Sequence, residues 1–359
     1  MGHEATGKPS RKPYPGPWFQ PWPRNAWYVA AGRNEIGRTL LARELLGEKV
    51  VLYRKENGEP VALTDRCPHR GYPLSKSELI GDQIQCGYHG MMFDCTGQCT
   101  DVPSQAGTVK AMRTTVFPLV ERWHWVWIWM GDPELADPAL IPASGYEEKP
   151  YNNEFLACVT IKANYQMAID NLLDPTHASF LHKGALDDAD SKDMACVKIH
   201  NHQEGRMVFQ ETVIPRFTPN AGIAGAFALE EAVPVIRKAK NMLHAPCFIN
   251  ANAVFCDSTN PDTVLSEFIA SMPIVPAGPG KLHHFLATSS TFPLNDGHRG
   301  YFLNLIDQDL DAMEAIQAAA NPADVDWEMS VRSDETGIRA RRILMKMIED
   351  EEQASVVTA

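Results

Sequence analysis

The spacing of apolar and polar residues indicates two halves of different structure. Up to about residue 135, short apolar runs are separated by turns, a pattern typical of small β-sheets. Four of these runs are expected strands: Val50–Tyr53, Val61–Leu63, Ile84–Gln85 and Trp123–Met130. In the last run, four Trp side chains share one face, and the other face is also largely apolar. This pattern favours a core strand buried on both sides, although an aromatic ligand platform would look the same.

The second half mixes helices with strands. A Pro- and acid-rich segment over residues 131–150 is expected to link the two halves. After it, the pattern predicts strands, a long helix around 165–183, further strands to about residue 306 and a helical end. The chain has 359 residues, which is long enough for two domains. We therefore expect an α+β fold, with an all-β part followed by a mixed part.

The composition and the N-terminal segment limit the kind of protein. The first 24 residues are basic and Pro-rich, and predict an irregular arm packed through Trp18, Phe19 and Trp22 instead of a signal peptide. No run of 18 apolar residues could span a membrane. The net charge of −12 disfavours nucleic-acid binding. The eight cysteines show no disulfide framework, so we expect a cytoplasmic protein.

One predicted helix, over residues 306–317, carries a carboxylate on its apolar face. Four residues fall at i, i+3, i+4 and i+7 and share that face: Asp309, Ala312, Met313 and Ile316. This face should point inward. A carboxylate buried there must be paired or bind a metal, because burying a lone charge is very costly. The alternative is that Asp307 or Asp309 caps the N-terminus of the helix.

Two cysteines and two histidines form a paired motif between residues 67 and 89. Cys67-Pro68-His69 is followed, after sixteen residues, by Cys86-Gly87-Tyr88-His89. In a Rieske [2Fe–2S] cluster, two thiolates bind one iron and two imidazoles bind the other. Zinc also accepts two Cys and two His, but zinc fingers usually group Cys with Cys and His with His. The mixed pairs and their Gly- and Arg-containing flanks favour the cluster.

A second group of ligands lies around residue 177. His177 and His182, with Asn171 and Asp174 close by, fall within two or three helical turns. Two His and one carboxylate with open positions are the signature of non-haem Fe(II) oxygenases. His177 and His182 are i, i+5, about 140° apart on an ideal helix, so we expect a distorted or π-bulged turn. Two His on a solvated helix face are the alternative, but a cluster in the same chain needs an electron acceptor.

Two further His pairs are possible ligands. His200 and His202 share one face of a predicted strand, and His283 is followed by His284. No carboxylate partner for them is evident in the sequence, so surface positions are expected.

With these motifs, the chain resembles the oxygenase component of Rieske non-haem iron monooxygenases, in particular the vanillate and dicamba O-demethylase group. The stretches that carry the resemblance are 67–75, 86–99 and 170–182. It implies that Cys67, His69, Cys86 and His89 bind the [2Fe–2S] cluster, and that His177, His182 and Asp309 bind a mononuclear Fe(II). Gln308 stands where Glu is usual in the group.

The resemblance also implies the roles of Asn171 and Asp174. Asn171 corresponds to an Asn at the iron site. Asp174 corresponds to a carboxylate that links an iron His, here His177, to a cluster His of the neighbouring subunit, here His89. A ring of subunits, a homotrimer, follows from this arrangement.

The domain boundaries that we expect are an irregular arm over 1–24, a Rieske domain over 25–140 and a helix-grip (START-like) catalytic domain over 141–359. The chain has no Gly-x-Gly-x-x-Gly dinucleotide motif, so NAD(P)H chemistry belongs to a separate reductase, with or without a ferredoxin. The expected activity is O2-dependent O- or N-dealkylation of a small, largely apolar aromatic compound.

Two alternatives stay open. The first is ring or methyl hydroxylation without dealkylation, which would release no formaldehyde. The second is a Rieske electron carrier fused to a ligand-binding module, which would have no mononuclear iron. A run of small residues over 221–229 is a candidate for the substrate pocket or for a surface loop.

Overall fold

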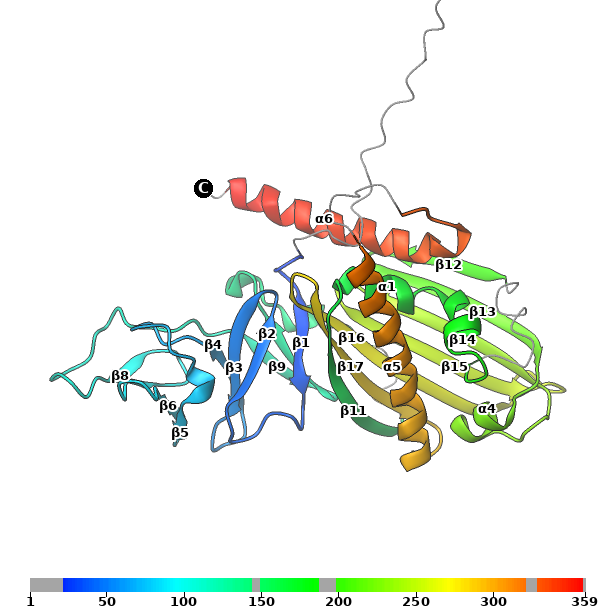
Figure 1. Cartoon of the computed structure of the whole chain (residues 1–359), viewed down its shortest axis with the longest axis horizontal. Coiled ribbons are helices and arrows are strands. Elements are labelled where there is room, and N and C mark those ends of the chain that lie inside the picture. Colours follow the sequence, from blue (N-terminus) through cyan, green and yellow to red (C-terminus); the bar gives the residue numbers. More distant parts are fainter. Residues whose placement is uncertain (1–21, 144–148, 187–197, 321–327, 358–359) are drawn as a thin grey trace, which may run out of the picture.

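The computed structural model describes residues 22–143, 149–186, 198–320 and 328–357, and Figure 1 shows their arrangement. Most of the arm expected at the N-terminus, with Trp18 and Phe19, lies outside the described residues, as does Cys196. Trp22 is described and packs edge-on against Tyr165, with ring centroids 6.4 Å apart. Figure 1 shows two sheet-containing parts side by side along the long axis of the molecule.

The N-terminal part contains three small antiparallel sheets, ordered β1-β10-β9, β2-β3-β4 and β5-β6-β7-β8. Its strands are β1 (Trp27–Gly32), β2 (Leu41–Leu45), β3 (Glu48–Arg54), β4 (Pro60–Thr64), β5 (Glu78–Ile80), β6 (Gln83–Gln85), β7 (Met92–Phe93), β8 (Cys99–Asp101), β9 (Leu119–Arg122) and β10 (Trp125–Trp129). Each of the four expected strands coincides with one of these. Trp123 lies outside β10, at a positive φ of 57°, in the turn that joins β9 to β10.

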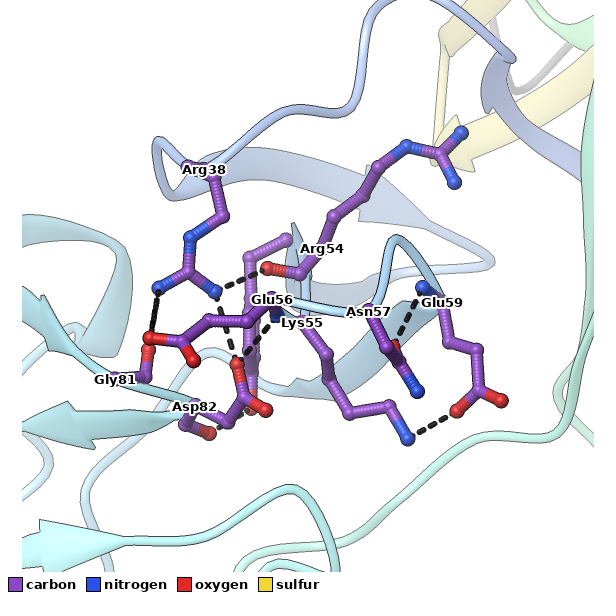
Figure 2. Close-up of polar contacts among 9 residues, drawn as sticks. Arg38, Arg54, Lys55, Glu56, Asn57, Glu59, Gly81 and Asp82 are labelled. Atoms are coloured by element: carbon purple, nitrogen blue, oxygen red, sulfur yellow. Dashed lines mark hydrogen bonds and ion pairs between the residues drawn. The ribbon is translucent and has the colours of Figure 1, made fainter.

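A polar network ties the β5–β8 sheet to the β2–β4 sheet (Figure 2). The Arg38 guanidinium donates to the carbonyl oxygen of Arg54 at 2.8 Å, to Asp82 Oδ1 at 2.9 Å and to the carbonyl oxygen of Gly81 at 2.6 Å. Asp82 Oδ1 also accepts a bond from the backbone N–H of Glu56 at 2.7 Å. This side chain therefore holds together the two sheets that carry the Cys loops, since the Cys67 loop follows β4 and the Cys86 loop joins β6 to β7.

The C-terminal part is built on one antiparallel seven-stranded sheet, ordered β11-β17-β16-β15-β14-β13-β12. Its strands are β11 (Asn152–Ile161), β12 (Ile199–Glu204), β13 (Met207–Phe217), β14 (Val235–His244), β15 (Phe248–Asp257), β16 (Val264–Gly278) and β17 (Lys281–Ser290). The helices are α1 (Tyr165–Leu172), α2 (Ala178–Leu181), α4 (Ala221–Ala226), α5 (Asp296–Ala319) and α6 (Glu335–Val357), with 3-10 helices η1 (Leu74–Lys76), η2 (Pro133–Leu135), η3 (Pro138–Leu140), η4 (Pro175–His177) and η5 (Arg332–Asp334). These elements confirm the α+β fold.

Strand β17 is buried over nearly its whole length because both of its faces are covered. On one face, the ring of Phe285 lies 6.1 Å from that of Trp125 in β10, between their centroids, so the N-terminal part packs there. On the other face, Leu286 points to the layer of α1 and α5, which crosses the sheet in Figure 1. The hydrophobic core is thus continuous through both parts.

Two expectations about the helices are wrong in detail. The long helix expected over 165–183 is instead α1, η4 and α2, because Pro175 lacks a backbone N–H and interrupts the helix. In α5, Asp309 and Met313 face inward as expected, but Ile316 is 48% exposed. The buried face continues toward the N-terminus through Ile306 and Phe302 instead. No helix among the described residues is both long and apolar enough to cross a membrane.

Candidate metal centres and substrate cavity

The two Cys-containing loops of the N-terminal part have the same backbone design. In the first, the N–H of Gly71 donates to the carbonyl oxygen of Cys67 at 2.8 Å; in the second, Gly90 donates to Cys86 at 2.9 Å. Gly71 and Gly90 have φ of 76° and 75°, values that favour glycine. Each loop therefore folds back tightly just after its ligand residues.

The folded loops bring the four sequence-predicted cluster residues together. The thiols of Cys67 and Cys86 are both buried and interact with each other. The rings of His69 and His89 lie edge to face, with centroids 4.7 Å apart. Burial, together with the neighbouring thiol of Cys86, raises the pKa of Cys67 to about 11.

This donor set fits a Rieske cluster. Two soft thiols lie on the buried side of the loops, and two imidazoles lie toward solvent, with His89 exposed. A metal ion would deprotonate the thiols outright and so override the effect of burial on their pKa. The exposed imidazole edge is the side from which an electron can enter or leave the cluster.

The second group of ligands comes from two segments that are distant in sequence. The side chain of Asp174 accepts a bond from the N–H of Thr176 at 2.8 Å and starts helix η4, which ends at His177. The following turn, α2, ends just before His182. The break at Pro175 therefore lets His177 and His182, at i and i+5, face the same point. A distorted turn was expected here, and the distortion is a 3-10 turn and not a π-bulge.

Asp309 completes this group from helix α5. Its Oδ1 lies 3.2 Å from Nε2 of His182 and 3.7 Å from Nε2 of His177. The ligand atoms of the three residues lie within 4.8 Å of one another, as a metal ion requires. Asp307 and Asp311, the neighbouring carboxylates, are exposed.

The Nδ1 atoms of His177 and His182 both lie beside oxygen acceptors, which leaves the Nε2 atoms available to bind a metal. Nδ1 of His177 lies 2.5 Å from the carbonyl oxygen of Asp174, and Nδ1 of His182 lies 2.8 Å from Oε1 of Gln308. Each Nδ1 must carry the hydrogen to make these bonds, so each Nε2 presents a lone pair. Two lone pairs and the Asp309 carboxylate, all directed at one point, fit a cation.

The pKa values of the two imidazoles agree with this arrangement. Burial lowers the pKa of His177, which favours its neutral form. Burial also acts to lower the pKa of His182, but the bond with Asp309 outweighs it, so that pKa is raised. Both directions follow from burial and from the carboxylate of Asp309, which favours a positive charge at this point.

Asn171 and Asp174 lie beside this group in different ways. Nδ2 of Asn171 donates to Oδ1 of Asp309 at 3.2 Å. The resemblance implied that the carboxylate of Asp174 contacts His177. Within this chain, the backbone oxygen of Asp174 accepts the bond from His177 instead. The carboxylate of Asp174 accepts bonds from Thr176, at 2.7 Å and 2.9 Å from its hydroxyl.

The other histidines differ in their surroundings. His200 is exposed, as expected, and His202 stacks on Phe209. The surface position expected for His283 and His284 is wrong, because both are buried in β17. Burial lowers the pKa of each to about 4, so both are neutral.

A cavity of about 180 Å³ adjoins the His177–His182–Asp309 group. Its floor is the sheet, where four small side chains leave room: Ala239, Ala251, Ala253 and Ala270. Phe268, from β16, adds an aromatic ring on the side of the sheet, and the facing wall is mostly apolar and includes Phe227, Phe302, Leu305 and Ile306. Of the small-residue run over 221–229, only Phe227 lines the cavity, since Ala224 and Ala226 are buried in the packing of α4.

Two family models match the sequence. The model described as the Rieske [2Fe-2S] domain matches residues 26–118. The model described as the vanillate O-demethylase oxygenase C-terminal domain matches residues 161–350, more than half of the chain. The chain belongs to this oxygenase family. The matched Rieske domain is a [2Fe–2S] domain, and the His177–His182–Asp309 group has the geometry to hold a metal ion; one solved structure of dicamba monooxygenase contains non-haem iron.

Curated relatives of this Rieske oxygenase include a putative toluene-4-sulfonate monooxygenase iron-sulfur subunit of Comamonas testosteroni, 43% identical over 163 residues, or 45% of this chain and 47% of the relative. The oxygenase component of dicamba O-demethylase from Stenotrophomonas maltophilia is 42% identical over 161 residues, or 45% of this chain and 48% of the relative. The chain thus spans about half the length of the curated relatives it matches.

Solved structures extend the similarity. Dicamba monooxygenase bound to 3,6-dichlorosalicylic acid superposes with a TM-score of 0.83 at 28% identity, over 92% of this chain and 98% of that one. The fold of this oxygenase, with an N-terminal Rieske part and a large sheet with helices, is therefore that of dicamba monooxygenase.

Sequence reasoning missed the partner of His182 in this oxygenase. Gln308 stood out only as a departure from the usual Glu, and the structure gives it a contact with His182. A neutral amide oxygen accepts the Nδ1 hydrogen as a carboxylate would, but it adds no negative charge beside Asp309.

Proposed function

We propose that this chain is the oxygenase component of a multicomponent monooxygenase that removes an alkyl group from an oxygen or nitrogen of a small, largely apolar aromatic compound. The observation that carries this proposal is the apolar cavity directly beside the three metal-binding groups of His177, His182 and Asp309. The Rieske domain over 25–140 supplies electrons, and the domain over 141–359 binds the substrate.

Each cofactor has its residues. Cys67, Cys86, His69 and His89 hold the cluster, and His177, His182 and Asp309 hold the iron. When bound, the cluster supplies electrons one at a time and the iron, with open positions, supplies O2 activation.

The residues around the iron site keep its ligands in one orientation. The carbonyl oxygen of Asp174 and Oε1 of Gln308 hold the hydrogens of the two imidazoles on Nδ1, so that both Nε2 atoms stay available. The amide of Asn171 orients the carboxylate of Asp309. Such outer contacts fix the tautomer and direction of metal ligands.

The cavity places a C–H bond of the substrate beside the iron site and excludes water with its aromatic walls. Insertion of one oxygen atom of O2 into the C–H bond of an O- or N-methyl group gives a hemiacetal or hemiaminal, and the other oxygen atom leaves as water. Two electrons and two protons are consumed, and the electrons come from the reductase. The product then collapses to formaldehyde and a phenol or amine.

The size of the cavity favours a single-ring substrate. A dry apolar cavity of about 150 Å³ holds benzene. The cavity here, about 180 Å³, therefore suits one substituted aromatic ring.

Electron delivery to the iron is from a neighbouring subunit. Figure 1 shows the β5–β8 sheet at the outer end of the Rieske part, whereas α1 and α5 lie over the large sheet of the other part. A ring of three subunits would set the exposed His89 of one copy against Asp174 of the next. Among the described residues, the carboxylate of Asp174 accepts hydrogen bonds only from Thr176. In such a ring it would accept a further bond from His89 of the next copy.

A separate ferredoxin or NAD(P)H reductase reduces the cluster. Five basic residues of the Rieske part are exposed and suit an acidic partner: Arg66, Arg70, Lys76, Lys110 and Arg113. Long-range attraction of this kind weakens as salt shortens the Debye length.

The test is turnover of methoxy- and N-methyl-substituted single-ring aromatics with a surrogate reductase. Dealkylation predicts formaldehyde in proportion to the O2 consumed. Oxygen incorporation without formaldehyde would instead favour ring or methyl hydroxylation. A protein that holds only the cluster and consumes no O2 would favour the electron-carrier alternative.

A further inference from the structure

Helix α1 ends in carbonyl groups that its own backbone does not satisfy. In an unbroken helix the carbonyl oxygen of Leu172 would accept a bond from the N–H of Thr176. That N–H donates instead to the side chain of Asp174. The break that turns His177 toward the iron site therefore leaves polar backbone groups inside the protein, where they need other partners.

Two amide side chains from the sheet supply these partners. Nε2 of Gln210, in β13, donates to the carbonyl oxygen of Leu173 at 2.6 Å. Nδ2 of Asn241, in β14, donates to the carbonyl oxygen of Leu172 at 3.2 Å and lies 3.4 Å from Oε1 of Gln210. Gln210 and Asn241 are also direct partners across the two strands, so they form one pair.

The bound segment lies between residues that the proposed function places at the iron. Leu172 and Leu173 follow Asn171, which donates to Asp309, and precede Asp174, whose carbonyl oxygen holds His177. A shift of this segment would therefore move Asn171 and His177 together. The segment also contacts the substrate cavity, which Leu172 and Asp174 line.

We propose that Gln210 and Asn241 are positioning residues that fix the end of α1 and thereby set the geometry of the iron site. The inference rests on the proposed function, because it assumes a metal ion at His177, His182 and Asp309. A buried amide is costly unless it is hydrogen-bonded, and Gln210 is 2% exposed. Gln210 lies on the cavity floor beside other polar side chains of the sheet, among them Thr212 and Asn241, and its amide donates to the carbonyl oxygen of Leu173.

The matched variants are Gln210→Met and Asn250→Leu. Each replaces a buried amide by an apolar side chain of similar size. Asn250 lies in β15, is also 2% exposed and accepts a bond from the hydroxyl of Ser271 at 2.7 Å. Its hydrogen bond within the described residues goes to β16 and not to the end of α1, so it controls for the general loss of a buried amide. Asn241→Leu tests the longer of the two bonds.

The experiment is Fe(II) titration of protein with the Rieske cluster intact and the mononuclear site emptied, together with the EPR spectrum of the nitric oxide adduct. We expect Gln210→Met to weaken Fe(II) binding about tenfold, as loss of outer contacts does, and to broaden the spectrum. Asn241→Leu should show a smaller change in the same direction. Asn250→Leu should lower the thermal unfolding temperature but leave Fe(II) binding and the spectrum as in the wild type.

Two results would overturn the proposal. The first is that Gln210→Met and Asn241→Leu bind Fe(II) and nitric oxide as the wild type does. The second is that Asn250→Leu loses as much affinity as Gln210→Met. If the wild type itself binds no Fe(II) beyond the cluster, the proposed function fails, and this inference fails with it. If Gln210→Met does not fold, Asn241→Leu against Asn250→Leu decides.

Discussion

The side-chain oxygen of Gln308 lies 2.8 Å from Nδ1 of His182 and joins helix α5 to the turn after α2. This contact holds the hydrogen of His182 on the side away from Asp309. Asp309 follows Gln308 directly in the chain, so two consecutive residues of α5 contact the two ring nitrogens of His182. The position of α5 on the sheet thus places the ligand Asp309 and also sets the orientation of the His182 ring.

Replacing Gln308 should weaken the iron site without removing a ligand. Gln308→Leu leaves Nδ1 of His182 without an acceptor, and Fe(II) affinity should fall by about 10- to 100-fold. Gln308→Glu keeps an acceptor and should retain binding. The measurement is Fe(II) titration of the emptied site. Equal affinity in Gln308→Leu and the wild type would show that the contact has no effect on the metal.

Replacing one cluster thiol should destroy the cluster. Cys67→Ser removes a direct ligand, so the visible absorption and the EPR signal of the Rieske centre should be lost. Cys99→Ser is the matched control, because Cys99 is also a buried, free thiol close in sequence to the loops. If Cys67→Ser kept a normal spectrum, or Cys99→Ser lost it, the assignment of the ligands would be wrong.

His283 should make the protein less stable in acid. Its Nε2 lies 2.9 Å from the carbonyl oxygen of Glu44, at the contact between the two parts, and burial lowers its pKa to about 4 from the ordinary value of 6.5. Below pH 6.5 the unfolded state binds more protons than the folded state, so stability falls as the pH drops from 6.5 to about 4. The slope from one such group is at most ~1.4 kcal/mol per pH unit.

The check is thermal unfolding across this pH range. His283→Gln keeps an N–H donor but cannot titrate, so the unfolding temperature should depend less on pH than in the wild type. His284, with a similar pKa, continues to contribute. A variant with an unchanged pH dependence would contradict the role of His283.

Asp174→Asn should separate electron transfer from metal binding. The contact with His177 uses the backbone oxygen of residue 174, so the iron site should keep its metal in this variant. The cluster should also stay intact. If the carboxylate bridges to a neighbouring copy, reduced cluster should no longer be oxidised by O2 in the presence of substrate. Rapid-mixing spectroscopy at the cluster absorption measures this rate, and a wild-type rate would remove Asp174 from the electron path.

Much of the fold and of the ligand set could be predicted from local sequence. The Cys67 and Cys86 loops are encoded by residues next to the ligands, and Asp309 is marked by its place on an apolar face. The buried positions of His283 and His284 could not be predicted, because they depend on β17 being covered on both faces. Likewise, Gln210 and Asn241 acquire their contacts only when β13 and β14 pack beneath the end of α1.

The form of the break at Pro175 could not be predicted from local sequence either. The spacing of His177 and His182 required a distortion, but the choice of a 3-10 turn depends on the Asp174 side chain capping Thr176. The cavity floor also comes from alanines on three separate strands, which no single stretch of sequence reveals.

The central claim is a mononuclear iron held by His177, His182 and Asp309, separate from the cluster. The most direct test is metal analysis and turnover of Asp309→Ala beside Asp311→Ala, whose exposed carboxylate lies in the same helix. We expect Asp309→Ala to keep the two irons, the two sulfides and the spectrum of the cluster but to lose the third iron and all formaldehyde release, whereas Asp311→Ala should behave as the wild type. A fully active Asp309→Ala that retains the third iron would contradict it.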